Sequence, residues 1–233
     1  MNAPVADMPD AAATRIAPGR FITFEGGEGA GKSTQARRLA ARLEQAGVRA
    51  VVTREPGGSP RAEALRSALL AGKAAGLGPF GEAVLFGAAR IDHIDTLIRP
   101  ALAGGAWVIC DRFADSTRAY QGAAGKARPE LIAALERVVV GPMKPDLTIL
   151  LDLDPEAGLA RARARAGDGA ADRFEGERID FHRALRAAFR DIAAKEPGRV
   201  RVVDAAASEQ EIADRIWEIV RDAFPAALKR GAA

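Results

Sequence analysis

Cysteine is nearly absent from this sequence of 233 residues, since Cys110 is the only one. A single cysteine excludes an internal disulfide framework and is typical of a reducing compartment, so we expect a cytoplasmic location. No apolar run approaches the roughly 20 residues that a membrane-spanning helix needs, so we expect no membrane segment. The formal net charge is only +3, with lysines and arginines spread along the chain, and we expect no nucleic-acid surface.

The first 19 residues are rich in alanine, proline and aspartate. They lack the basic start and apolar stretch of a secretory signal, and Asp7 and Asp10 also argue against a targeting peptide. We therefore expect a flexible extension without function over residues 1–19. The remaining length and the 48% hydrophobic content suit one α/β domain, which we place at residues 20–228.

Glycine is concentrated between an apolar run at 21–25 and a helix-like segment at 34–45. The glycine-rich segment matches the phosphate-binding pattern G-x-x-x-x-G-K-[ST] at every fixed position, in the strand–turn–helix setting that this pattern requires. Glycines let successive backbone N–H groups face phosphate oxygens, while Lys32 reaches the outer phosphates and the Ser33 hydroxyl binds Mg²⁺. The residues expected to bind ATP or GTP are Gly26, Gly27, Glu28, Gly29, Ala30, Gly31, Lys32, Ser33 and Thr34. An ordinary glycine-rich turn that contains Lys-Ser is the alternative.

Short apolar runs alternate with helix-like segments along the rest of the chain. The runs expected to form strands are 21–25, 48–53, 107–111, 146–152 and 200–204. This alternation predicts an α/β fold in which a central five-stranded parallel sheet carries helices on both faces. The second run, VRAVVT, is expected to be a buried strand.

Charged residues follow two of the expected strands. Arg54 ends the sequence VVTR, and Asp111 with Arg112 closes WVICDR. Ligands of open parallel sheets collect at the carboxyl ends of the strands, which favours phosphate binding by the arginines and Mg²⁺ binding by Asp111. A solvated loop charge is the alternative for Arg54, and a structural ion pair is compatible with the role expected for Asp111 and Arg112.

Phe86 and Arg90 are four residues apart on the helix expected at 81–102, so they share one face. A ring and a guanidinium on one face can stack on a nucleobase and hydrogen-bond its edge. Core packing beside a surface charge is the alternative. Farther along the chain lie polar residues that either read a base edge or cap a helix: Ser116, Thr117, Tyr120 and Gln121.

Arginines recur on the helix expected to begin at Pro155. They are Arg161, Arg163 and Arg165, with Arg173 beyond a Gly-Asp-Gly break. Such a basic helix end joined to a flexible loop is a candidate lid at about 161–175 that closes over ATP and presents arginines to the transferring phosphoryl group. A solvated basic face is the alternative.

Four blocks, taken in order, resemble the thymidylate kinase family, of the bacterial kind with lid arginines. They are EGGEGAGKST (25–34), TREPGG (53–58), FGAAR (86–90) and DRFADSTRAYQG (111–122). The segments 161–165 and 172–173 are similar to that family's lid, and the likeness spans about 20–224. The resemblance implies a P-loop nucleoside monophosphate kinase fold with a small lid. It also implies a homodimer that phosphorylates dTMP to dTDP with ATP and Mg²⁺, in dTTP biosynthesis.

The resemblance further implies roles in holding dTMP. Phe86 would stack on thymine and Arg90 would hydrogen-bond the base edge. Thr117 and Tyr120 would hold the base and the deoxyribose, with Tyr120 excluding a ribose 2′-OH. Glu28 would lie near the sugar 3′-OH.

Other implied roles concern phosphate. Arg54 and Arg112 would grip the dTMP phosphate, and Asp111 would assist with Mg²⁺. Some family members carry an arginine inside the phosphate loop, where this chain has Gly29. A lid arginine would therefore act on the transferring phosphoryl group, in the order of preference Arg165, Arg161 and Arg173. The alternatives are another nucleoside or nucleotide kinase and, more distantly, a non-catalytic nucleotide-binding switch; the absence of an Asn-Lys-x-Asp motif argues against a GTPase.

Overall fold

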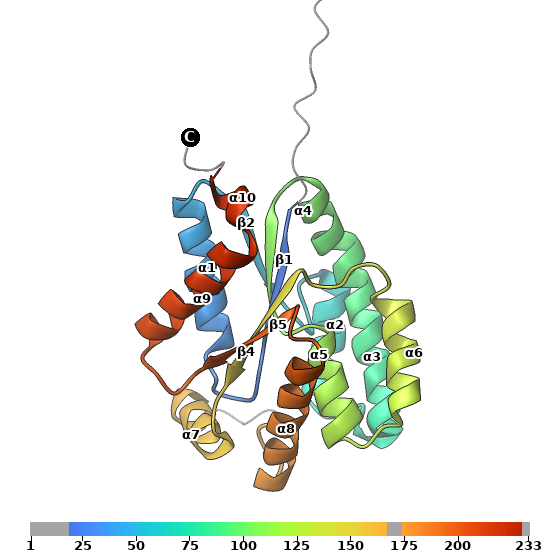
Figure 1. The fold of residues 1–233 in the computed structure, drawn as a ribbon. Helices are drawn as coiled ribbons and strands as arrows, with labels where there is room; N and C mark the ends of the chain where they lie inside the picture. Colours follow the sequence, from blue (N-terminus) through green and yellow to red (C-terminus); the bar gives the residue numbers. More distant parts are fainter. Residues whose placement is uncertain (1–18, 167–173, 230–233) are drawn as a thin grey trace, which may run out of the picture.

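The computed structural model describes residues 19–166 and 174–229. A five-stranded parallel sheet with the order β2-β3-β1-β4-β5 runs through its centre (Figure 1). The strands are β1 (Phe21–Glu25), β2 (Ala50–Arg54), β3 (Trp107–Asp111), β4 (Leu147–Asp152) and β5 (Val200–Asp204). The predicted parallel sheet is thereby confirmed.

Successive side chains of the central strand enter different cores, because side chains alternate between the two faces of a strand. Ile22 and Phe24 belong to the core beneath α1 and α9, whereas Phe21 packs on the opposite face with Val108. Both faces are covered, and continuous apolar runs are typical of parallel strands buried in this way. One of the two buried polar residues of β1, Thr23, hydrogen-bonds Thr148 of β4 with 2.7 Å between their hydroxyl oxygens.

The second strand departs from the prediction. It begins at Ala50, and β3 is the strand that pairs with it, so β2 lies at the edge of the sheet. Val52 in its middle is 42% exposed. The expectation of a buried strand at 48–53 was therefore wrong, because the apolar run carries no information about which strand ends the sheet.

Helices cover both faces of the sheet, as expected (Figure 1). On one side lie α1 (Lys32–Gln45), α9 (Glu209–Ala223) and α10 (Pro225–Lys229). The apolar stripe of α9 turns Ile212, Ile216 and Val220 inward, and a reciprocal capping box between Ser208 and Glu211 begins the helix. Residues four apart on one helix face thus anchor α9 on the sheet.

The other side carries most of the remaining helices. They are α2 (Pro60–Leu70), α3 (Gly78–His93), α4 (Arg99–Ala103), α5 (Ala114–Thr117), α6 (Pro129–Val139) and α8 (Ile179–Lys195). The helix expected at 81–102 is α3 and α4 joined by a π-helical segment, Ile94–Ile98, and a 3₁₀ turn, Ala75–Leu77, precedes α3. A second π-helical segment, Arg118–Ala124, follows α5. Such segments are frequent near functional sites.

Parallel strands direct all their carboxyl ends to one edge of the sheet. At this edge β1 leads into the phosphate-binding loop, β3 ends at Asp111, and β4 leads into α7 (Pro155–Ala166). The fold therefore brings together segments that are far apart in the sequence. Among the residues that the structure describes, no single helix is long and apolar enough to cross a membrane; α2 with the segment Ala75–Ala103 passes by length and composition only as a pair bent by 82°.

Candidate active site

One cavity of about 440 Å³ opens at the carboxyl edge of the sheet. Its lining includes the predicted site residues Glu28, Gly29, Gly31, Lys32, Ser33, Thr34, Arg54, Phe86, Arg90, Asp111, Arg112, Thr117, Tyr120, Gln121 and Arg165. These side chains come from the phosphate-binding loop, the β2–α2 connection, α3, the β3–α5 region and α7. Residues predicted separately for nucleotide and acceptor binding thus share a single cavity.

The phosphate-binding loop wraps around the amino end of α1. Gly29 has φ +64°, and a Cβ there would lie 2.0 Å from the carbonyl oxygen of Gly158, so a side chain at this position would clash with the backbone as it stands here. Lys32 Nζ donates to the carbonyl oxygens of Gly26, at 3.2 Å, and Gly27, at 2.7 Å. Burial, followed by the positive charge of Arg112, lowers the pKa of Lys32 to about 8. A bound polyanion would stabilise the charged lysine, as expected of a phosphate ligand.

Two oxygen-bearing side chains meet where Mg²⁺ was expected. The Ser33 hydroxyl donates to Asp111 Oδ2, and both residues line the cavity. No cluster of three histidine, cysteine, aspartate or glutamate side chains suitable for a metal occurs within 19–166 and 174–229. One hydroxyl and one carboxylate nevertheless fit Mg²⁺, which commonly keeps several waters and takes its other ligands from substrate phosphates.

Arg112 occupies a backbone conformation that is unusual for a residue with a side chain, with φ +70°. Its N–H donates to the Phe24 carbonyl at 2.9 Å, and the next N–H, that of Phe113, donates to Glu25 Oε1 at 2.8 Å. Ser116 Oγ donates to Glu25 Oε2 at 2.6 Å. The buried Glu25 carboxyl thus holds the left-handed turn from two sides, and burial, with Asp115 nearby, raises its pKa to about 7.

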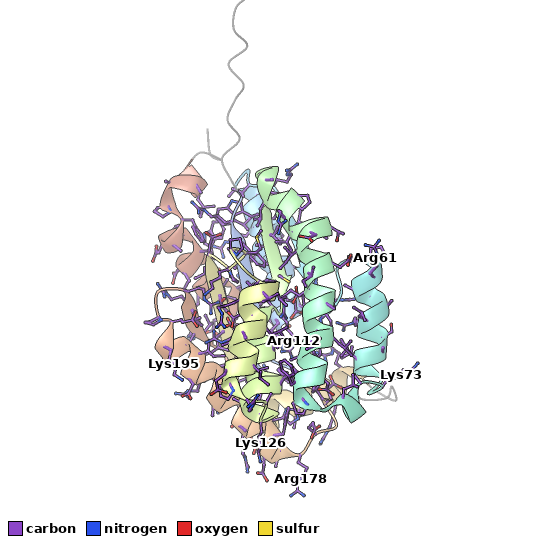
Figure 2. All side chains as sticks on the ribbon, turned by 90° about the vertical axis from the view of Figure 1, so that its right-hand side faces the viewer. Arg61, Lys73, Arg112, Lys126, Arg178 and Lys195 are labelled. Atoms are coloured by element: carbon purple, nitrogen blue, oxygen red, sulfur yellow. The ribbon has the colours of Figure 1, made fainter. Side chains whose placement is uncertain are left out.

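The turn directs the Arg112 side chain inward. Figure 2 shows Arg112 within the outline of the molecule, in contrast to peripheral cations such as Lys73 and Lys195. Arg112 Nη2 donates to Glu28 Oε1 at 2.8 Å, and the Tyr120 hydroxyl donates to the same oxygen at 2.5 Å. Burial acts to raise the pKa of Glu28, but Arg112 and Lys32 outweigh burial and bring that pKa to about 2.

The end of the cavity lined by Phe86 and Arg90, named the acceptor end after the role predicted for these residues, combines an aromatic wall with a buried arginine. Phe174 lies 6.4 Å from Phe86 and 5.2 Å from Tyr120, measured between ring centroids. Arg90 Nη2 donates to the Phe113 carbonyl at 3.1 Å and to Thr117 Oγ1 at 3.2 Å. A planar ring between such a wall and this guanidinium would find stacking and hydrogen-bonding partners.

Comparison with known proteins agrees with this geometry. A family model described as Thymidylate kinase matches residues 24–216. Thymidylate kinases of Rhodopseudomonas palustris (strain TIE-1) and Bradyrhizobium diazoefficiens are 64% identical over 205 residues and 57% identical over 216 residues. The alignments cover 87% and 92% of this chain, and 89% and 95% of the relatives. The crystal structure of thymidylate kinase from Ehrlichia chaffeensis superposes with a TM-score of 0.68 at 34% identity, covering 87% of this chain and 99% of that one.

This chain belongs to the thymidylate kinase family. The resemblance carried by the four sequence blocks is confirmed, and so is the fold expected from it. Of the arginines predicted for a lid in this thymidylate kinase family member, Arg165 lines the cavity and lies 3.4 Å from Glu175. Arg161 is not part of the lining and donates to the Ala205 carbonyl at 3.0 Å. Arg173 falls outside the described residues.

Arg54 lies at the open side of the cavity. Its side chain is 55% exposed and forms an ion pair with Glu63 at 3.3 Å. The exposure of Arg54 agrees with the alternative of a solvated charge. Arg54 also lines the cavity, so the predicted contact with a phosphate is compatible with its position.

Several cavity residues of this thymidylate kinase family member had no predicted role. Glu55 and Arg66 also line the cavity, and Glu25 holds the Arg112 turn. The position of Glu55 in the sequence could have indicated a role, because Glu55 directly follows β2 just as Arg112 directly follows β3. Arg66 lies on α2, where no local pattern separates it from arginines that lie outside the cavity.

Proposed function

We propose that this member of the thymidylate kinase family transfers the γ-phosphoryl group of ATP to dTMP, giving dTDP and ADP for dTTP synthesis in the cytoplasm. One observation carries the proposal: Lys32 of the phosphate-binding loop lines the same cavity as Phe86 and Arg90. A phosphoryl donor and a nucleotide with a planar base would therefore meet in one cavity. The family name of the relatives supports dTMP as the acceptor.

The barrier to this reaction is the repulsion between two polyanions. The phosphate oxygen of dTMP is a nucleophile near pH 7, so a strong base is not required. Lys32 would hold the outer phosphates of ATP, Arg112 the dTMP phosphate, and Arg165 the transferring group. Their positive charges would lower the repulsion and align the reacting groups, which supplies most of the catalysis in phosphoryl transfer.

The acceptor would be selected at the aromatic end of the cavity. Phe86 would stack on thymine, and Arg90 would donate to the base edge beside Thr117. Tyr120 and Glu28, which are hydrogen-bonded to each other, would face the deoxyribose. Gln121 lines the same end and would contribute to recognition of the base.

Magnesium would be held by Ser33 and Asp111, together with the phosphates of ATP. When bound, Mg²⁺ supplies electrostatic stabilisation of the phosphate oxygens. The chain's own contribution is to keep the Ser33 hydroxyl and the Asp111 carboxylate side by side, at the end of β3 and the start of α1.

The proposal is tested by measuring ADP release from purified protein with ATP, MgCl₂ and a panel of acceptors: dTMP, dUMP, dCMP, dGMP and thymidine. We expect dTMP to give the highest kcat/KM. The Lys32→Ala variant is the control, and we expect it to lose at least about a hundredfold in kcat, since it removes a charge from the reacting phosphates. No ADP release above background with dTMP, or a clear preference for another acceptor, would contradict the proposal.

We also propose that two copies of the chain pair through α3. Two exposed apolar residues of α3, Val84 and Ile91, are seven residues apart and therefore share one side of this helix, and Val138 of the neighbouring α6 is 80% exposed. Contiguous exposed apolar surface marks contacts with other proteins. The resemblance to the family supports a second copy as the partner.

A further inference from the structure

A chain of buried hydrogen bonds links β2 to α3 beneath the acceptor end of the cavity. Thr53 Oγ1 lies 2.7 Å from His93 Nε2, and His93 Nδ1 lies 3.0 Å from Glu55 Oε1. The second carboxylate oxygen, Glu55 Oε2, accepts from Arg90 Nε at 2.6 Å. The order along the chain of contacts is therefore Thr53, His93, Glu55 and Arg90.

These groups are shielded from water. The side chain of His93 is 0% exposed, that of Glu55 is 4% exposed and that of Arg90 is 6% exposed. Gly58, with φ +86°, packs directly against the His93 ring, because a Cβ there would lie 2.4 Å from His93 Nε2. Hydrogen bonds in such a dry place are strong, and their partners are costly to leave unpaired.

Both nitrogens of the imidazole ring are engaged, and this decides its orientation. A carboxylate only accepts hydrogen bonds, so His93 Nδ1 donates to Glu55. In the neutral ring, Nε2 then accepts from the Thr53 hydroxyl. His93 on one oxygen and Arg90 on the other together prevent rotation of the Glu55 carboxylate.

The orientation of Glu55 in turn decides that of Arg90. Arg90 Nε is used by Glu55, and Nη2 is used by the Phe113 carbonyl and Thr117. Within the part of the chain that the structure describes, Nη1 is the guanidinium nitrogen left without a hydrogen bond. Arg90 lines the cavity beside Phe86, so this nitrogen is the group available to a ligand.

We propose that His93 is a positioning residue of the acceptor site, which acts through Glu55 to set the place of Arg90 Nη1 and thereby the preference for a base with a carbonyl acceptor. The inference rests on the proposed function, since it takes dTMP as the acceptor. A guanidinium donates but never accepts, so its correct placement favours the carbonyl-bearing edge of thymine over the amino-bearing edge of cytosine.

Two matched substitutions separate this role from a general contribution to stability. In His93→Asn the shorter amide occupies the place of Nδ1 and can still donate to Glu55, whereas in His93→Gln the longer amide reaches the place of Nε2 and Thr53. We expect His93→Gln to raise the KM for dTMP about tenfold and to lower the preference for dTMP over dCMP, because misplacement of a binding group by about 1 Å has effects of this size or larger. His93→Asn should restore the KM for dTMP to within about threefold of the unaltered protein, with kcat and the KM for ATP retained in both variants.

A second readout needs no activity. The chain contains only two histidines, so the His93 ring can be assigned by NMR from the loss of its signals in His93→Asn. We expect the ¹⁵N shifts to report Nδ1–H, and the Arg90 Nε–H to exchange slowly in the unaltered protein and in His93→Asn but fast in His93→Gln. Equal KM values and equal base preference in the two variants, or Arg90 exchange that is unaffected by His93→Gln, would overturn the inference. Lack of any dTMP turnover by the unaltered protein would instead refute the proposed function, and the exchange data would still decide the positioning role.

Discussion

The ion cluster at Glu28 offers a quantitative test of how the cavity holds its cations. One carboxylate oxygen accepts from both Arg112 and the Tyr120 hydroxyl, and Lys32 contributes positive charge nearby. Burial opposes ionisation of Glu28, but the cations prevail and lower its pKa from an ordinary 4.5 to about 2. Glu28→Gln keeps the size and a carbonyl acceptor while it removes the negative charge.

The lowered pKa converts into a stability difference with a defined sign. A shift from 4.5 to about 2 corresponds to about 3 kcal/mol in favour of the folded protein with ionised Glu28. Because the folded-state pKa is depressed, this stabilisation is complete well above pH 4.5 and is lost as the pH falls towards 2. We therefore expect Glu28→Gln to lose about 3 kcal/mol at neutral pH, and the difference from the unaltered protein to shrink by about 2 kcal/mol at pH 3.

Urea unfolding followed by far-UV circular dichroism at pH 7, 5 and 3 measures these differences. Glu44→Gln, at an exposed position of α1, is the matched control and should stay within about 0.5 kcal/mol of the unaltered protein. Equal stability of Glu28→Gln and the unaltered protein at pH 7 would refute the reasoning. A deficit that does not depend on pH would refute it as well, since it would come from packing instead of charge.

Three further predictions concern catalysis, base binding and assembly. Arg165→Ala should lower kcat about a thousandfold with little change in the KM for dTMP, because an arginine that contacts the transferring group acts mainly in the transition state. Phe86→Ala should raise the KM for dTMP about tenfold, since stacking on a base contributes about 1–3 kcal/mol. Val84→Glu should convert a dimer to a monomer in size-exclusion chromatography with light scattering, because the charge would be buried between the copies.

Each prediction has its own control or contrary result. Arg163→Ala, on the same helix but outside the cavity lining, should leave kcat unchanged, and an equal loss in both arginine variants would remove Arg165 from the reaction. An unaltered KM for dTMP in Phe86→Ala would reject stacking. Val202→Glu, at a 52% exposed position of β5, should stay dimeric, and a dimer that survives Val84→Glu would place the contact elsewhere.

Elements that depend on local signals were predictable from the sequence. Alternating turns and apolar runs placed β3 at 107–111 and β5 at 200–204, as observed. β2 begins two residues later and ends one residue later than expected. It is also an edge strand, because strand order depends on which elements pack together and leaves no mark within a short apolar run. Likewise α1 begins at Lys32, earlier than expected, since the end of the phosphate-binding loop is already helical.

Many residues that line the candidate site were predicted from the sequence, but the residues that hold those side chains in place were not. Phe86 and Arg90 share one helix face, their roles came from the resemblance of the block FGAAR to the family, and both line the cavity. The carboxylate that holds Arg90 is 35 residues away in the sequence, and the threonine behind His93 is 40 residues from it. Such pairs arise only when β2 and α3 pack together, so no periodicity within one segment reveals them.

Buried carboxylates lie beside the cations of a cavity that we expect to bind anions, and their charges offset the repulsion between those cations. Arg112 and Lys32 repel each other, and that repulsion helps to lower the pKa of Lys32 to about 8. Glu28 offsets the repulsion from within the phosphate-binding loop, and Glu55 neutralises Arg90 at the other end of the cavity. Each acid lies just beyond the carboxyl end of a parallel strand, where the sheet converges on the ligand. The cations can therefore stay charged and close together before any nucleotide arrives, and the preorganisation on which phosphoryl transfer depends is built into the connections that follow the strands.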